Sequence, residues 1–346
     1  MQINPTADSN TLNIGVVGGG SWGTALANLL AHKGYTITLW VYEEDVKDQI
    51  EETGENKIFL PGIKLSTNLH PTNDISETVA GKDIVVVVVP SHFMREISSQ
   101  MADDVSKKAI IVTASKGIEN KTHLTMTGVF KETLPNIAHH RMVALSGPSF
   151  AREVARKLPT VITIAATDME TAALTQKVFA TPYFRVYTSE DVIGVEVGGA
   201  LKNVIAIGAG VVDGLELGLN ARAALITRGM TEIRRIGLKM GANPRTFTGL
   251  AGIGDLILTC TGDLSRNHTV GVKLGQGKKI DDILAEMHMV AEGVKTARSV
   301  YNLSRKLNVN MPIFHEAYRI LYEDDSPKEA IHRLMTRDLK QELDER

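Results

Sequence analysis

The chain has 346 residues, of which 43% are hydrophobic and 23% are charged, and its formal net charge is -2. This composition excludes a disordered chain, and the length favours two packed domains over one large core. Lysine and arginine are scattered along the chain, so no basic surface for nucleic acid or anionic lipid is predicted. A small charged substrate is the better expectation.

The cysteine count and the apolar runs indicate where the protein works. Cys260 is the single cysteine, so neither an intrachain disulfide nor a multi-cysteine zinc site can form, and we expect a small buried hydrophobe. Residues 1–10 lack the basic flank and apolar core of a signal peptide. The apolar run 84–89 is too short to cross a bilayer, and no other run approaches the roughly 20 residues needed. We therefore expect a soluble, cytoplasmic protein without an integral membrane segment.

Short β-branched runs alternate with amphipathic stretches in the first half of the chain, which is typical of parallel strands joined by helices. Continuous apolar character predicts that these strands are buried on both faces, with helices above and below the sheet. The predicted fold class is α/β, with an N-terminal doubly wound, Rossmann-type sheet. The expected strands are 12–17, 36–40, 84–89, 109–113, 143–145, 161–165 and 185–187.

The second half differs in composition and in the spacing of its apolar residues, and it predicts a mostly α-helical domain. Residues 195–212 are rich in glycine, alanine and aliphatic side chains, and 221–238 and 280–287 carry apolar residues at helical spacing. Glycines at 249–254 and 275–277 predict turns. No internal repeat or low-complexity linker separates the halves, and the predicted boundary lies between residues 188 and 196.

A glycine-rich motif follows the first expected strand directly. Residues 18–23 fit G-x-G-x-x-G and precede an expected helix over 24–32. In such a motif Gly18 permits a tight turn, Gly20 lets the backbone approach a pyrophosphate, and Gly23 allows close packing of helix on strand. This context favours dinucleotide binding over a merely flexible loop. Residues 1–193 are therefore predicted to form a dinucleotide-binding domain.

The end of the second strand bears on which dinucleotide binds. An acidic residue there can hold the ribose 2′-hydroxyl, whereas a basic one accommodates a 2′-phosphate. Glu43 and Glu44 suit the first arrangement, but they are equally expected as caps of the next helix, and Lys47 lies one helical turn beyond. Both NAD(H) and NADP(H) stay open as the cofactor.

Eight stretches of the chain carry a further signal, and they are residues 18–26, 89–92, 115–119, 146–151, 199–204, 249–256, 265–267 and 290–294. Together they resemble the NAD(P)-dependent glycerol-3-phosphate dehydrogenases, the bacterial type in particular. The family resemblance implies reversible hydride transfer between NAD(P)H and dihydroxyacetone phosphate, giving sn-glycerol 3-phosphate for glycerophospholipid synthesis, and it suggests a homodimer. Two positions depart from the expected pattern, because Val41-Tyr42 stands where an arginine would indicate NADP, and Ala291 where a second aliphatic is expected.

Lys202 is the predicted acid–base group. Reduction of a ketone needs an acid for the developing alkoxide, and burial beside a second ammonium would lower the pKa of a lysine towards neutrality. Without the resemblance, a helix lysine that reaches solvent would be the simpler interpretation. The resemblance assigns the catalytic role to Lys202, lets Asp255 orient it and contact substrate, and makes Lys116 a further catalytic residue that contacts substrate and cofactor. Residues 194–346 are thus predicted to form a helical substrate-binding and catalytic domain.

Three consecutive polar residues are suited to the substrate phosphate. Ser265, Arg266 and Asn267 supply a hydroxyl, a guanidinium and an amide, although a plain polar loop would look the same. The resemblance adds Gly147 and Ser149 as substrate contacts. The cofactor contacts that it implies, including the glycines of the motif, are Gly18, Gly20, Ser21, Trp22, Gly23, Tyr42, Lys116, Ala151, Arg266, Val290 and Glu292.

The histidines do not predict a metal site. His92 is given a structural or cofactor-lining role, and the other histidines lack metal-ligand spacing, so no catalytic metal is expected.

Two alternative functions are considered. One is another lysine-dependent reductase, acting on a hydroxy acid or a phosphorylated sugar acid. The other is a non-catalytic NAD(H)-binding sensor, which would have no use for Lys202, Asp255 and Lys116 together.

Overall fold

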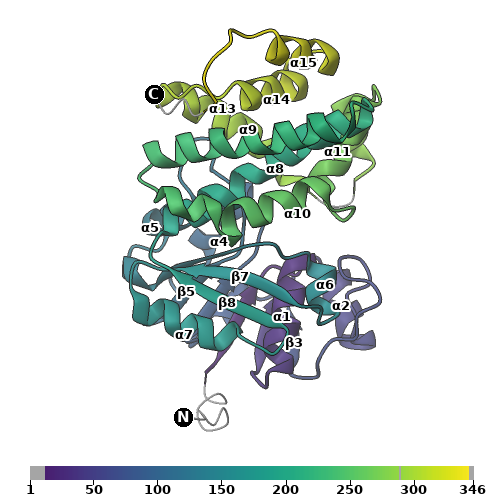
Figure 1. The fold of residues 1–346 in the computed structure, drawn as a ribbon. Coiled ribbons are helices and arrows are strands. Elements are labelled where there is room, and N and C mark those ends of the chain that lie inside the picture. The colour runs from purple at the N-terminus through teal and green to yellow at the C-terminus, as the bar shows by residue number, and fades with distance from the viewer. Residues whose placement is uncertain (1–11, 288–289, 343–346) are drawn as a thin grey trace. The chain divides into compact units, whose positions relative to one another are not determined.

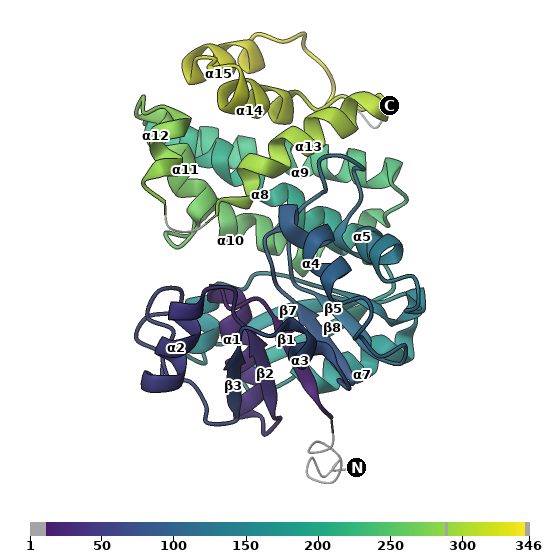
Figure 2. The same cartoon turned by 180° about the vertical axis from the view of Figure 1, so that it is seen from behind.

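A computed structural model of the chain describes residues 12–287 and 290–342. The chain forms two compact units (Figure 1, Figure 2). Unit 1 consists of Met1–Ser115 and Met126–Val192, and unit 2 of Lys116–Thr125 and Ile193–Arg346. The segment 1–10, where no signal peptide is predicted, lies outside the described residues.

Unit 1 is built on an eight-stranded sheet in the order β3-β2-β1-β4-β5-β6-β7-β8. The first six strands have the order 3-2-1-4-5-6 of the Rossmann fold, so the direction of the strand order reverses between β1 and β4. Ligands of open α/β sheets bind beyond the carboxyl ends of the strands at such a reversal. The strands are β1 (Ile14–Val17), β2 (Ile37–Trp40), β3 (Leu69–Thr72), β4 (Ile84–Val87), β5 (Ile110–Thr113), β6 (Met142–Ser146), β7 (Thr160–Ala165) and β8 (Phe184–Ser189).

The sheet departs from the prediction at three strands. The edge strand β3 was not predicted, because it contains Pro71, which is tolerated at a sheet edge. The expectation of parallel pairing throughout is wrong for β6 and β7, which run antiparallel with Leu145 opposite Ile164. Burial on both faces is wrong for β8, where Arg185 and Tyr187 are exposed because alternate residues of this edge strand point outwards.

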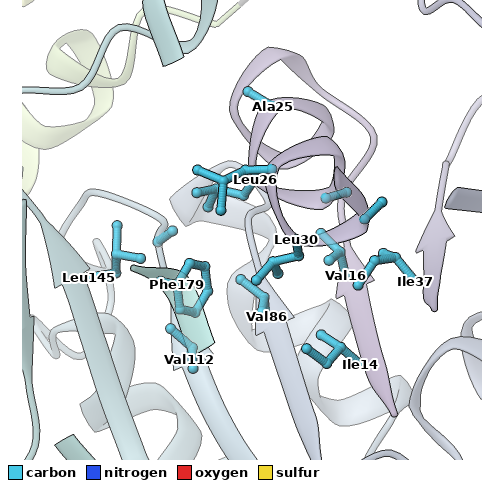
Figure 3. Close-up of a cluster of buried hydrophobic side chains, with 14 of the residues drawn as sticks. Ile14, Val16, Ala25, Leu26, Leu30, Ile37, Val86, Val112, Leu145 and Phe179 are labelled. Atoms are coloured by element: carbon cyan, nitrogen blue, oxygen red, sulfur yellow. The ribbon is translucent and has the colours of Figure 1, made fainter. Parts of the chain in front are cut away.

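Helices pack on both faces of the sheet, as a doubly wound fold requires. Ile14 and Val16 of β1 point into a buried cluster with Leu26 and Leu30 of α1 and with Phe179 of α7 (Figure 3). Gly15 faces the other side, where a Cβ atom would lie 1.9 Å from the carbonyl oxygen of a residue in α3. The helices of unit 1 are α1 (Ser21–His32), α2 (Glu44–Thr53), α3 (Ile75–Val79), α4 (Met94–Gln100), α5 (Met126–Thr133), α6 (Ala151–Ala155) and α7 (Met169–Phe179).

Unit 2 consists of helices around one apolar core, together with the segment 116–125. Leu201 and Ile205 of α8 contribute to this core, as do Ile236 of α9 and Phe314 of α14. Ile118 brings the segment 116–125 into the same core. The helices are α8 (Val192–Gly214), α9 (Gly218–Lys239), α10 (Asp255–Thr261), α11 (Arg266–Gly275), α12 (Ile280–Ala285), α13 (Glu292–Lys306), α14 (Pro312–Tyr322) and α15 (Pro327–Met335).

Although no uninterrupted apolar run of the sequence is long enough to cross a bilayer, the length and mean hydropathy of α8 as a whole would suffice. However, 89% of its most apolar 18-residue window is buried inside the protein. A helix that is apolar all round and is surrounded by protein is the central helix of a core. The apolar character of α8 is therefore explained by its neighbours in unit 2.

The helices predicted over 195–212, 221–238 and 280–287 correspond to α8, α9 and α12. The turn predicted over 249–254 is wrong in form, since Leu250–Gly254 winds as a wide helical turn that leads into α10. A Cβ atom at Gly252 would lie 2.2 Å from the carbonyl oxygen of Phe247, so only glycine is accommodated there. The compact units also differ from a single division after residue 193, because the segment 116–125 packs in unit 2.

Candidate active site

The glycine loop lies where the strand order of the sheet reverses. Gly18 has a φ of +123°, and a Cβ atom on it would lie 2.5 Å from the carbonyl oxygen of Val88, just beyond β4. A Cβ atom on Gly23 would lie 1.9 Å from the carbonyl oxygen of Gly18. By contrast, a Cβ atom on Gly20 would meet open space. The loop is therefore folded tightly on itself and on β4, and it leaves room for a ligand beside Gly20.

The N-terminus of α1 is suited to an anion. Gly20 is its N-cap and contributes no capping side chain, and the first turn contains no acidic residue. Trp22, in that turn, has an indole Nε1 that is buried without a hydrogen-bond partner among the described residues. Free N–H groups and the positive end of the helix dipole favour a pyrophosphate here. These residues fit a dinucleotide in the way that the sequence predicts.

At the end of β2 the side chains are acidic and aromatic. Tyr42 is 76% exposed and packs the edge of its ring against Trp40. Glu43 is the N-cap residue of α2, but its side chain makes no capping hydrogen bond, so the carboxylate is not used by the helix. Lys47 donates to Glu51 at 2.7 Å and to Asp48 at 3.2 Å, within its own helix. The lysine that could have received a 2′-phosphate is thus engaged elsewhere.

The loop after β6 carries the other predicted contacts of unit 1. Gly147 has a φ of +144°, and a Cβ atom on it would lie 2.9 Å from the Cα of Ile162. The hydroxyl of Ser149 donates to the carbonyl oxygen of Gly147 at 2.9 Å. Ala151 begins α6 and packs against the core of unit 1. His92, in the loop after β4, is exposed and lies with its ring 4.1 Å from that of Phe93.

In unit 2 a buried carboxylate joins two lysines that are far apart in the sequence. Lys116 donates to Oδ2 of Asp255 at 2.8 Å, and the ammonium of Lys202 donates to Oδ1 of the same residue. The side chain of Asp255 is 1% exposed, that of Lys202 8% and that of Lys116 17%. The three predicted catalytic residues of this chain therefore meet at one point.

The electrostatics of this cluster set the proton affinity of Lys202. Burial lowers its pKa to about 7, Asp255 opposes this effect, and the ammonium of Lys116 reinforces it. Burial alone would raise the pKa of Asp255, but the two ammonium groups hold it below its usual range. Lys202 can consequently both give and take a proton near neutral pH, beside a carboxylate that stays ionised.

Thr259 belongs to the cluster, although the sequence analysis did not single it out. Lys202 Nζ donates to its hydroxyl at 2.8 Å, and that hydroxyl donates to the backbone oxygen of Asp255 at 2.6 Å. Asp255 is the first residue of α10, so Thr259 lies one turn later on the same helix face. The i, i+4 spacing from Asp255 is the signal that would have revealed it. Together the two residues orient the ammonium of Lys202.

The three residues that are predicted to bind the substrate phosphate lie at the start of α11. Ser265 is the N-cap, and its hydroxyl accepts from the backbone N–H of His268 at 3.2 Å. Asn267 is buried, and its Oδ1 accepts from the N–H of Gly293 at 2.9 Å. Arg266, between them, is exposed. Two of the three side chains therefore hold the turn in place, while desolvation by the surrounding protein lowers the pKa of the guanidinium of Arg266.

The residues before α13 hold the last predicted contacts. Ala291 is the N-cap residue of α13 and is 3% exposed. The alanine that stands where the family pattern has a second aliphatic residue is therefore buried in the core. Val290 is 38% exposed, and Glu292 opens the first turn of the helix. Since Gly293 bonds to Asn267, this turn and the first turn of α11 lie side by side.

Two protein-family models match the chain over nearly its whole length. The model of the N-terminus of NAD-dependent glycerol-3-phosphate dehydrogenase matches residues 13–172, and the model of its C-terminus matches residues 191–332. The chain belongs to this family. The resemblance that the sequence motifs carry is thereby confirmed.

Individual members of the glycerol-3-phosphate dehydrogenase family agree with this result. A glycerol-3-phosphate dehydrogenase (NAD(P)+) of Syntrophobacter fumaroxidans is 56% identical over 331 residues, which are 96% of this chain and 97% of that protein. One from Geobacter sulfurreducens is 56% identical over 95% of this chain and 98% of its own length. The crystal structure of the enzyme from Coxiella burnetii is 38% identical and covers 94% of this chain and 99% of its own, with a TM-score of 0.91. The predicted α/β fold with a helical C-terminal part is confirmed.

The histidine, cysteine and acidic side chains of the described residues bear on metal binding and thiol reactivity in this member of the glycerol-3-phosphate dehydrogenase family. No group of three or more histidine, cysteine, aspartate or glutamate side chains that could hold a metal ion occurs in the described part of the chain. Cys260 is buried in the core of unit 2, as predicted, and burial raises the pKa of its thiol to about 12. The thiol therefore stays protonated, unlike a nucleophile.

Proposed function

We propose that this chain reduces dihydroxyacetone phosphate to sn-glycerol 3-phosphate, and catalyses the reverse reaction, with Lys202 as the acid and base. As a member of its family, the chain is an NAD(P)-dependent oxidoreductase that acts on glycerol 3-phosphate. The observation that carries the proposed mechanism is the buried cluster of Lys202, Asp255 and Lys116, with the pKa of Lys202 lowered to about 7. When bound, the dinucleotide supplies the hydride for C2 of the ketone.

In the proposed mechanism, the ammonium of Lys202 donates its proton to the C2 oxygen as this oxygen becomes an alkoxide. Asp255 and Thr259 hold the ammonium in position, which limits the reorganisation needed at the moment of transfer. Lys116 keeps a second positive charge on the other oxygen of Asp255, so that this carboxylate does not fix the proton on Lys202. In the reverse direction the neutral amine of Lys202 accepts the proton of the C2 hydroxyl.

The remaining predicted site residues are proposed to bind the two ligands. Ser265, Arg266 and Asn267 would hold the substrate phosphate, with Gly147 and Ser149 as further substrate contacts. Phosphate binding remote from C2 lowers the barrier only if it holds C2 in a reactive position, so its loss should lower kcat as well as affinity. The proposed dinucleotide contacts are Gly18, Gly20, Ser21, Trp22, Gly23, Tyr42, Lys116, Ala151, Arg266, Val290 and Glu292.

Absorbance at 340 nm tests this function directly. Purified protein should oxidise NADH or NADPH with dihydroxyacetone phosphate, and far more slowly with unphosphorylated dihydroxyacetone. Lys202→Ala should lower kcat by at least about a hundredfold while the dinucleotide still binds, because general acid catalysis is lost. Lys239→Ala, at an exposed lysine near the end of α9, is the matched control. Dinucleotide binding without turnover of dihydroxyacetone phosphate would support a sensor, and near-normal activity of Lys202→Ala would remove that residue from the mechanism.

Family membership also supports a cellular role and an assembly for the chain. We place the chain in the cytoplasm, where sn-glycerol 3-phosphate would serve glycerophospholipid synthesis, and we propose that it forms a homodimer. Light scattering coupled to size-exclusion chromatography should give the mass of two 37.6 kDa chains. A mass of one chain at micromolar concentration would contradict the dimer.

A further inference from the structure

Helix α11, whose first turn carries Arg266, packs against α8 through glycines on both helices. Gly210 and Gly214 of α8 are spaced four residues apart, as are Gly271 and Gly275 of α11. A Cβ atom on Gly210 would lie 2.1 Å from the carbonyl oxygen of His268, and one on Gly271 2.0 Å from that of Ile207. The two backbones are therefore in direct contact, with no side chain between them.

This contact fixes a distance that matters for the reaction, because α8 also carries Lys202. The proposed phosphate-binding turn and the proposed proton donor belong to two helices that touch backbone to backbone. Val270 and Leu274 of α11 also pack in the core of unit 2, but apolar contacts have no preferred direction. A hydrogen bond between the helices adds a directional restraint on the first turn of α11.

Asp213 and His268 supply such an interaction at this end of the glycine contact. Nε2 of His268 lies 2.8 Å from Oδ2 of Asp213, which is in the last turn of α8. Arg222 of α9 donates to the same oxygen at 2.8 Å. Burial alone would raise the pKa of Asp213, but its hydrogen bonds with His268 and Arg222 hold it below the usual range. The carboxylate is thus charged at neutral pH and links three helices.

The bond between His268 and Asp213 is made two residues after Arg266, in the same first turn of α11. Ser265 caps the helix through the N–H of His268, and Asn267 ties the turn to Gly293. His268 adds the third tie, on the side of α8, two residues after Arg266. Arg266 is therefore carried by a turn that Ser265 caps within α11, that Asn267 ties to the first turn of α13 and that His268 ties to α8.

We propose that Asp213 and His268 are positioning residues for the substrate phosphate, acting through Arg266. The inference rests on the proposed role of Arg266 in phosphate binding. Breaking the bond between Asp213 and His268 lets the first turn of α11 rotate on the glycine contact, so that the phosphate is no longer held where C2 can react. The hydrogen bonds of Lys202, Asp255 and Thr259 do not involve Asp213 or His268, so we expect the acid–base step at Lys202 to be retained.

The ratio of kcat/KM for dihydroxyacetone phosphate to that for dihydroxyacetone tests the proposal. General damage to the fold lowers both values, whereas misplaced phosphate binding lowers only the first, so the ratio reports on the phosphate alone. His268→Ala and Asp213→Ala should each lower the ratio by about tenfold, with an increase in KM and a decrease in kcat. His268→Gln, whose amide can donate to Asp213 from nearly the same place, should restore most of it.

Matched variants separate the possible outcomes. Lys273→Gln removes an ion pair with Glu286 from the far end of α11 and should leave the ratio unchanged. Arg266→Ala should lower the ratio more than either positioning variant does. If Arg266→Ala left the ratio unchanged, the proposed phosphate site itself would be wrong. If it lowered the ratio while His268→Ala and Asp213→Ala, folded as judged by thermal melting, did not, only the positioning role would be refuted.

Discussion

Lys202 is a lysine whose environment makes neither of its protonation states strongly preferred at neutral pH. Burial removes the solvation of its ammonium, and Asp255 returns part of that stabilisation, while Lys116 competes for the same carboxylate. Without Lys116, the pair of Lys202 and Asp255 would hold its proton more firmly. The proton affinity of Lys202 is thus set in part by Lys116, which lies 86 positions earlier in the sequence (202 − 116).

The pH dependence of the two reaction directions should therefore be opposite. Ketone reduction needs protonated Lys202, so kcat/KM should fall by about tenfold for each pH unit above about 7. Alcohol oxidation needs the neutral amine, so its kcat/KM should rise up to about pH 7 and then level off. Initial rates at 340 nm between pH 5.5 and about 9 would measure both profiles. Ionisation of the substrate phosphate affects both directions alike, and parallel profiles would therefore argue against Lys202.

Coenzyme choice should be decided at the end of β2. The unused carboxylate of Glu43 can accept from a ribose 2′-hydroxyl but repels a 2′-phosphate, and Lys47 is held by Glu51. We expect NADH to bind at least about tenfold more tightly than NADPH, as measured by titration of nicotinamide fluorescence. Glu43→Gln should narrow the difference, whereas Glu52→Gln, at an exposed carboxylate near the other end of α2, should not. Equal binding of both coenzymes by the unaltered chain would contradict this assignment.

At the scale of elements, helix N-termini carry most of the proposed chemistry. The open end of α1 would receive a pyrophosphate, Asp255 begins α10, and Arg266 begins α11. The N–H groups at the N-terminus of α14 are bound by a side chain from another helix. Glu232 of α9 is buried and accepts from the N–H of Ile313 at 3.1 Å and of Phe314 at 3.3 Å, in the first turn of α14.

This contact between α9 and α14 should make stability depend on pH. Burial raises the pKa of Glu232 to about 7, while the two N–H groups and the charges of Arg235 and Arg337 oppose the effect. A carboxyl pKa that is raised in the folded state favours folding below about 4.5, and this contribution is lost as pH rises towards about 7. The full difference is roughly 3 kcal/mol of unfolding free energy.

Urea unfolding at pH 5 and pH 8 would measure this contribution of Glu232. Glu232→Gln, which keeps an acceptor for the two N–H groups without a charge, should show a smaller loss between the two pH values than the unaltered chain. Glu232→Ala should destabilise the protein by about 2–4 kcal/mol, since two buried N–H groups lose their acceptor. The same pH dependence in the unaltered chain and in Glu232→Gln would show that the carboxyl group does not titrate in this range.

At the scale of the whole molecule, the chain passes from one unit to the other more than once. Residues 116–125 leave unit 1 after β5 and pack in unit 2, and the chain then returns to α5. Ile118 is 2% exposed in the core of unit 2, and its backbone oxygen accepts from the hydroxyl of Ser299 at 2.7 Å. This anchoring is what brings Lys116 to Asp255.

Ile118 should consequently behave as a core residue although it lies in a connecting segment. Ile118→Ala should lower the free energy of unfolding by about 2–5 kcal/mol and should also lower kcat, because the position of Lys116 depends on it. Denaturant unfolding and the 340 nm assay would measure the two effects. The exposed Lys121→Ala, in the same segment, should change stability by less than about 0.5 kcal/mol. A similarly small effect at Ile118 would mean that the segment is not anchored by this side chain.

Local patterns were sufficient to predict much of the molecule. The glycine motif, the β-branched runs and the helical spacing each lie within a few residues of one another, so the sequence alone determined the doubly wound sheet, the mostly helical second half and the dinucleotide loop. The small apolar residues around Lys202 did not by themselves predict its burial, because a lysine that reaches solvent was the simpler interpretation until the family resemblance was considered. The family resemblance then indicated which polar residues are catalytic and which bind the substrate or the cofactor.

Only the tertiary structure decided how distant segments combine. The meeting of Lys116 with Asp255, the antiparallel pairing of β6 with β7 and the edge position of β3 depend on contacts between segments that no local pattern encodes. The same holds for Thr259 as a partner of Lys202 and for the bond between Asp213 and His268. Propensity and periodicity specify which element a segment forms and which side is apolar, whereas the pairing of elements is set by the packing of the whole core.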